Sequence, residues 1–162
     1  MSYVSLLTIV HTILSFIAIG FGIIATVGLF GGDHSSRWTR GFFFTAVAVT
    51  LTGFIFPFTG VTPAFATGIV STVILLAWLI AYRSHLAGSW RWIYALAIVA
   101  SLYLLIFVTI AQAFQKIPFL QAMAPTGSEA PFAIAQIVAL VVFIVIGVGA
   151  VRRFRPAGAV QV

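Results

Sequence analysis

Five long apolar stretches, separated by short polar segments, constrain the fold more than any other feature of this sequence. The stretches cover residues 3–30, 41–58, 65–82, 92–114 and 132–151. Each has roughly the length of ~20 residues that a helix needs to cross the hydrocarbon core of a bilayer. Backbone polar groups in lipid must be paired within the segment. We therefore predict an all-α integral membrane protein, a bundle of five transmembrane helices.

The composition supports a membrane protein rather than a soluble one. Apolar residues make up 62% of the chain and charged residues 6%, whereas about a quarter of the residues of a soluble domain are charged. We expect a single transmembrane domain over residues 1–156 and a flexible tail at 157–162. The first stretch is expected to remain as a helix, because no basic residue precedes it and it is too long for the apolar region of a signal peptide.

The basic residues predict the orientation. With five spans, Lys116 stands alone on one side of the membrane. Seven arginines share the other side: Arg37, Arg40, Arg83, Arg91, Arg152, Arg153 and Arg155. Joining 41–58 and 65–82 into one span would divide the basic residues five against three. The positive-inside rule favours five spans, with the N-terminus outside and the C-terminus in the cytoplasm. We expect the arginines to attract anionic lipid at the cytoplasmic face, and we expect no nucleic-acid partner.

Several chemistries lack the residues they need. The chain has no cysteine, which removes thiolate nucleophiles, disulfides and cysteine-ligated metals. Its two carboxylates, Asp33 and Glu129, are predicted on opposite faces of the membrane, so they cannot act as a catalytic pair. His34 and His85 fall in cytoplasmic loops, far from His11. We therefore expect no enzymatic activity, no metal and no cofactor.

Polar residues within the spans gather in the outer half of the membrane and form the candidate site. In the first span, steps of three and four residues place Thr8, His11, Ser15, Ala18, Gly22 and Ala25 on one helix face. Small and weakly polar residues favour contact between helices in lipid, so this face is predicted to point into the bundle. Thr109 and Gln112 in the fourth span and Gln136 in the fifth lie at a similar depth. The sequence predicts a periplasm-facing polar pocket for a small or lipid-like ligand.

Two other interpretations of the same residues remain open. An interior histidine and two glutamines can serve only to hold helices together, in an accessory or assembly subunit of a membrane complex. His11 can also line a channel or proton path in a homo-oligomer, since ionisable groups inside membranes often mark such paths. We predict that His11 faces other helices and lies within hydrogen-bonding reach, directly or through one water, of a polar group of the fourth or fifth span.

The segment 115–131 combines three prolines with the apolar residues Phe119, Leu120 and Met123, and we predict that it lies along the outer surface as an interfacial lid. Lys116 and Glu129 stand at its two ends, where they can pair. The hydroxyls of Thr45, Thr50 and Thr52 in the second span are expected to bond back to carbonyls of their own helix.

Several runs of the sequence resemble small multi-pass inner-membrane proteins of proteobacteria. These runs are TGFIFPF (52–58), AGSWRWIY (87–94), FVTIAQAFQKIP (107–118), APTGSEAPFAIAQ (124–136) and AVRRFRP (150–156). The resemblance implies a location in the bacterial inner membrane. No function is assigned to the proteins it concerns, so it implies no catalytic residue, ligand or cofactor.

Overall fold

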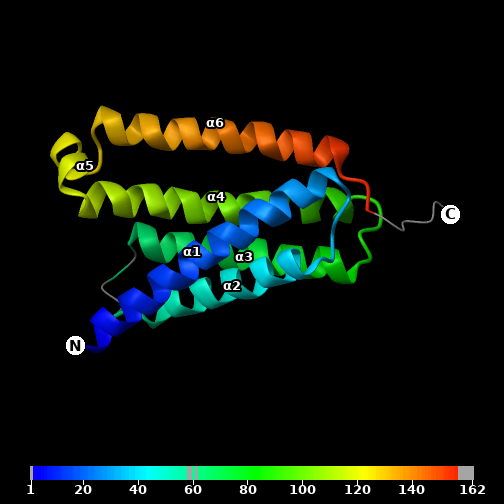
Figure 1. Ribbon diagram of the computed structural model, residues 1–162, viewed down its shortest axis with the longest axis horizontal. Coiled ribbons are helices and arrows are strands. Elements are labelled where there is room, and N and C mark those ends of the chain that lie inside the picture. Colours follow the sequence, from blue (N-terminus) through cyan, green and yellow to red (C-terminus); the bar gives the residue numbers. More distant parts are fainter. Residues whose placement is uncertain (1, 58–59, 61, 157–162) are drawn as a thin grey trace.

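Helices make up most of the chain. The computed structural model describes residues 2–57, 60 and 62–156, and within that part the chain contains helices and no strand (Figure 1). The helices are α1 (Tyr3–Phe30), α2 (Arg37–Ile55), α3 (Pro63–Arg83), α4 (Trp90–Lys116), α5 (Pro118–Met123) and α6 (Ala130–Arg153). All except α5 are long and apolar enough to cross a membrane. The predicted tail, 157–162, lies outside the described residues.

Local capping explains where the helices begin. The side chains of Ser2, Ser36 and Thr62 each accept a hydrogen bond from a backbone amide three residues later, which satisfies a donor that the first turn leaves unpaired. Because Ser36 caps α2, the helix starts at Arg37, four residues before the predicted span. It ends at Ile55, since Phe56 precedes Pro57 and adopts extended backbone angles.

Four of the long helices form a ring. α1 packs against α2, α2 against α3, α3 against α4, and α4 returns to α1. α6 lies outside this ring, where it packs mainly along α4. The short α5 sits beside the C-terminal end of α4, at the end of the bundle where the chain begins (Figure 1). α4 is therefore the central helix, with the ring on one side and α6 on the other.

The two ends of the bundle differ in charge. Successive long helices run in alternating directions, so seven arginines lie together at one end, which we call the basic end. They are Arg37, Arg40, Arg83, Arg91, Arg152, Arg153 and Arg155. Lys116 lies at the opposite end, which we call the open end. The predicted seven-to-one division of the basic residues is thus present in the fold.

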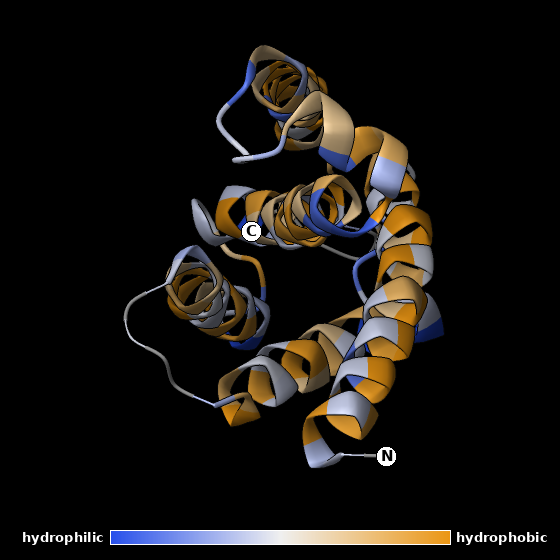
Figure 2. Cartoon of the chain, turned by 90° about the vertical axis from the view of Figure 1, so that its left-hand side faces the viewer, coloured by the Kyte–Doolittle hydropathy of each residue, from blue (hydrophilic) through white to orange (hydrophobic). Residues whose placement is uncertain are grey.

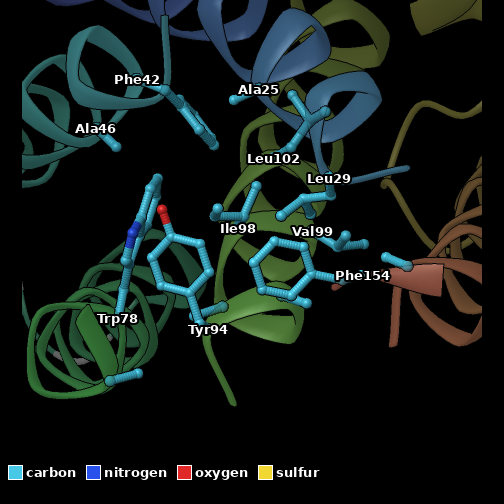
Figure 3. Close-up of a cluster of buried hydrophobic side chains, with 14 of the residues drawn as sticks. Ala25, Leu29, Phe42, Ala46, Trp78, Tyr94, Ile98, Val99, Leu102 and Phe154 are labelled. Carbon is cyan, nitrogen blue, oxygen red and sulfur yellow. The ribbon is translucent and has the colours of Figure 1, made fainter. Parts of the chain in front are cut away.

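The tightly packed core occupies the half of the bundle next to the basic end (Figure 3). Tyr94 is fully buried; its ring stacks on Phe154 with centroids 5.8 Å apart and meets Trp78 edge-on at 6.1 Å. Its hydroxyl donates to the carbonyl of His34 in the α1–α2 loop. Phe154 reaches this cluster because the chain folds back after α6. The aromatic side chains close the basic half of the bundle.

Small residues on α1 allow the close packing of this half. Ala18 and Ala25 are 0% and 1% exposed, as the predicted interior face requires. A Cβ on Gly22 would lie 2.9 Å from both the Phe42 ring and the Leu102 side chain. α1 therefore approaches α2 and α4 as closely as a glycine permits. Toward the open end the same face carries Thr8, His11 and Ser15, and there the helices separate.

Candidate functional site

A cavity of about 660 Å³ lies between α1, α2, α3 and α4 in the half of the bundle next to the open end. Figure 2 looks at the chain from that end, where these helices stand around a common centre. Apolar side chains supply much of the wall. The polar side chains that line it are Thr8, His11, Thr12, Ser15, Thr50, Thr62, Thr67, Ser71, Ser101, Thr109, Gln112 and Lys116. Of the predicted site, Thr8, His11, Ser15, Thr109, Gln112 and Lys116 meet here.

His11 lines the cavity, but its partner is not the predicted one. Its Nδ1 atom lies 2.9 Å from the hydroxyl of Thr52 on α2, and its ring packs edge-on against Phe56 at 5.5 Å. His11 faces other helices, as predicted, but its direct hydrogen-bond partner is on the second span and not on the fourth or fifth. The cavity itself separates α1 from α4 at this depth, whereas α1 stays packed against α2.

The hydrogen bonds of Thr52 assign the tautomer of His11. The Thr52 hydroxyl lies 2.8 Å from the carbonyl of Ala48 and 3.0 Å from that of Val49, and its one proton is directed to this backbone. Thr52 then accepts from the Nδ1–H of His11, which leaves Nε2 as a hydrogen-bond acceptor. Thr45 and Thr50 bond back to their own helix in the same way, as predicted.

Gln136 does not belong to the cavity. Its side-chain amide donates to the backbone carbonyl of Phe107 at 3.1 Å, and its Oε1 atom is buried without a partner among the described residues. α6 packs against the face of α4 that points away from the ring, so α4 stands between Gln136 and the cavity. The depth of Gln136 along its helix was predicted correctly, but its neighbours were not.

The segment 115–131 does not form the predicted lid. Its helix α5 packs against α4 and leaves Phe119 72% exposed, and the lining residues it supplies are Lys116 and Ile117. The α2–α3 turn borders the cavity instead, through Phe56, Pro57, Gly60 and Thr62. This turn is joined directly to two helices of the ring, whereas segment 115–131 leads away from the ring to α6.

Glu129 forms a local turn instead of the predicted pair with Lys116. Glu129 is the N-cap residue of α6. Its carboxylate accepts three hydrogen bonds, from the Thr126 amide at 3.0 Å, the Thr126 hydroxyl at 2.8 Å and the Ser128 amide at 3.0 Å. The bond from the Thr126 amide is the largest of the influences that lower the pKa of Glu129 to about 2. Glu129 is therefore a structural residue of the α6 start.

Three hydroxyls form the floor of the cavity, and the sequence analysis missed them as a group. Thr50, Ser71 and Ser101 lie 13, 12 and 11 residues from the basic-end limits of α2, α3 and α4, and therefore at nearly the same depth. Thr50 and Ser71 are hydrogen-bonded at 2.8 Å. The Ser101 hydroxyl is buried and has no partner among the described residues. Counting residues from the arginine-bearing ends would have revealed this level.

The described polar side chains that line the site can donate and accept hydrogen bonds, and no carboxylate is among them. Asp33 lies in the α1–α2 loop at the basic end and Glu129 at the open end, so the two carboxylates are far apart. No group of three His, Asp or Glu side chains within the described part of the chain could hold a metal ion. Compared with protein-family models, curated proteins and solved structures, the chain matches none of them.

Proposed function

We propose that the chain is a non-enzymatic membrane protein that binds a small or lipid-like ligand in the cavity between α1, α2, α3 and α4. The cavity itself carries this proposal. Its volume of about 660 Å³ falls within the ~300–1,000 Å³ that is usual for small-molecule sites. Apolar walls with a few convergent polar groups are also typical of such sites, because the walls provide affinity and the polar groups fix orientation.

We further propose that the open end faces the periplasm of a bacterial inner membrane. The arginines at the basic end support this orientation, since cytoplasmic segments of membrane proteins are enriched in Lys and Arg. A ligand would then enter from the periplasm or from the outer leaflet. The Lys116, Thr62 and Gln112 side chains line the cavity within about one turn of the open end and would be the first polar groups that it meets.

The closed core argues against a channel through a single chain. Below the floor hydroxyls, Phe42, Trp78, Tyr94 and Phe154 pack together and are all buried. An ion would have to displace these rings to reach the basic end. The Nδ1 atom of His11 is also hydrogen-bonded within its own chain, so it does not need His11 of a second copy as a partner.

Native mass spectrometry of the purified protein tests the proposal. We expect a bound small molecule on the parent chain and its loss from a variant with Leu104→Trp and Val108→Trp, two cavity-wall residues one turn apart on α4. The matched control is Val141→Trp with Val145→Trp, which have the same spacing on α6 and are 53% and 66% exposed. Equal retention in both variants would contradict the proposal. A co-purified protein that survives cavity filling would support the accessory-subunit alternative.

A further inference from the structure

We propose that the ligand is a lipid-like alcohol whose hydroxyl group lies at the floor of the cavity, hydrogen-bonded to Ser101 and Ser71. This inference rests on the proposed function, because it specifies the ligand of the same cavity. The evidence for it is the hydrogen bonding of the three floor hydroxyls, those of Thr50, Ser71 and Ser101.

Ser101 is the first observation that points to a ligand. Hydroxyls inside helices commonly donate to the carbonyl four residues earlier, as those of Thr50, Thr72 and Thr109 do. Ser101 makes no such bond, although it is 4% exposed and lines the cavity. A buried donor without a partner is unfavourable. A group that accepts this proton from within the cavity removes the penalty.

Ser71 supplies the complementary half of the site. The Thr50 hydroxyl donates to the carbonyl of Ala46 at 2.9 Å, so the 2.8 Å bond between Thr50 and Ser71 uses the proton of Ser71. The Ser71 oxygen then keeps lone pairs that can accept. Ser101 offers a donor and Ser71 an acceptor at one level, and a single ligand hydroxyl uses both.

The charge distribution of the cavity favours a neutral group at the floor. Lys116, the charged residue of the lining, lies 15 residues along α4 from Ser101, a rise of about 22 Å. A carboxylate or ammonium at the floor would therefore be desolvated without a counter-charge, which is costly. The wall between the floor and the open end contains Phe54, Leu104 and Val108, and it suits a hydrocarbon body.

Photocrosslinking with a defined probe tests the orientation. The probe is a long-chain primary alcohol with a diazirine beside the hydroxyl-bearing carbon, added to the full chain in lipid nanodiscs and mapped by peptide mass spectrometry. We expect crosslinks in segments 67–75 and 97–105. A second probe with the diazirine at the far end of its chain should label 108–117. Crosslinks of the first probe at 108–117, or labelling of none of these segments, would overturn the inference. Neither result would overturn the proposed function, which fails only if native mass spectrometry finds equal retention of a ligand in the cavity-filled and control variants.

Variants at Ser101 test its role as the donor. Ser101→Ala should weaken crosslinking at the floor by about fivefold, the usual effect of one hydrogen bond on affinity, and Ser101→Thr should restore it because the hydroxyl is kept. Thr72→Ala is the matched control: the Thr72 hydroxyl donates to the Gly68 carbonyl of its own helix, and among the described residues Thr72 is not part of the cavity lining. Unchanged floor labelling in Ser101→Ala, with thermal unfolding equal to the parent, would overturn the assignment.

Discussion

The His11 side chain bonds to Thr52, and the hydroxyl of Thr52 is already satisfied by the backbone of α2. Removal of the imidazole therefore leaves no buried group unpaired on the α2 side. Hydrogen bonds between helices in membranes contribute on average about 0.6 kcal/mol. His11 thus has little to add to stability, and its position on the cavity wall points to a role in binding.

We predict that His11→Leu changes the free energy of unfolding by less than about 1 kcal/mol, because one interhelical bond is lost and a side chain suited to an apolar environment replaces it. The same variant should retain less of the small molecule that co-purifies with the parent, because one polar group of the cavity wall is lost. Unfolding titrations in mixed micelles and native mass spectrometry measure the two effects. A loss of more than about 2 kcal/mol would be too large for one such bond and would make His11 a structural residue.

Glu129 gives a prediction about pH. Its folded pKa of about 2 lies below the ordinary value of 4.5, chiefly because of the Thr126 amide. Since the folded pKa is depressed, its contribution to stability is fully present above pH 4.5 and is lost as the pH falls toward 2. Carbon NMR of the carboxyl group should show a midpoint near 2. In Glu129→Gln this part of the acid sensitivity should disappear, and a midpoint near the ordinary value would refute the turn geometry.

The helices divide into a packed half and a separated half. α4 shows the division along its length. Its buried residues run from Tyr94 to Leu102, apart from Phe114, which packs against Phe132 of α6, while Thr109, Gln112 and Lys116 face the cavity. α1 is divided in the same way: its inward face carries small residues toward the basic end and polar residues toward the open end. From Gly22 toward the basic end, the helices of the ring are packed tightly together.

A pair of glycines on α1 tests this contact. Gly22→Ala should destabilise the protein by about 1–3 kcal/mol, the usual cost of overpacking, because its Cβ would meet Phe42 and Leu102 at 2.9 Å. Gly20→Ala is the control: no atom of the described residues lies within 4 Å of a Cβ added there, and alanine favours a helix by about 0.5–1 kcal/mol over glycine. The two variants should shift thermal unfolding in opposite directions. Equal shifts would contradict the close approach.

The helices could be predicted from hydropathy because each span must satisfy its backbone alone. The first span, 3–30, agrees with α1 at both ends, and the others differ by one to four residues at each end. At the starts of α2 and α3 the capping residues Ser36 and Thr62 account for the difference. The short α5 was not predicted, since six residues carry too little periodicity. Hydropathy predicts the length of each helix, but it does not predict which helices pack against one another.

The arrangement of neighbours decides the site, and this explains what the sequence missed. Gln136 and His11 were predicted at similar depth, yet α4 separates them. Thr52, Ser71 and Ser101 seemed ordinary because threonine and serine are common inside membrane helices. Their roles follow from the ring of α1, α2, α3 and α4, which depends on packing between segments distant in sequence.

The orientation that we propose for the whole molecule rests on the arginines at the basic end. A fluorescent protein fused to the C-terminus should fold and fluoresce in bacterial cells, because that end is expected in the cytoplasm. Alkaline phosphatase fused at the same site should be inactive, since it requires the periplasm. An active phosphatase fusion with a dark fluorescent fusion would reverse the orientation.

A hollow that opens at the end bearing Lys116 can be probed directly, because the chain has no cysteine and each introduced thiol is unique. Thr109 lines the cavity and Ile137 is 59% exposed on α6; both lie seven residues from the open-end limit of their helix, at a depth of about 10 Å. In intact cells, a membrane-impermeant thiol reagent should label Thr109→Cys and not Ile137→Cys. The long-chain alcohol should protect Thr109→Cys. Failure to label Thr109→Cys from outside, or equal labelling of both variants, would contradict a ligand cavity open to the periplasm.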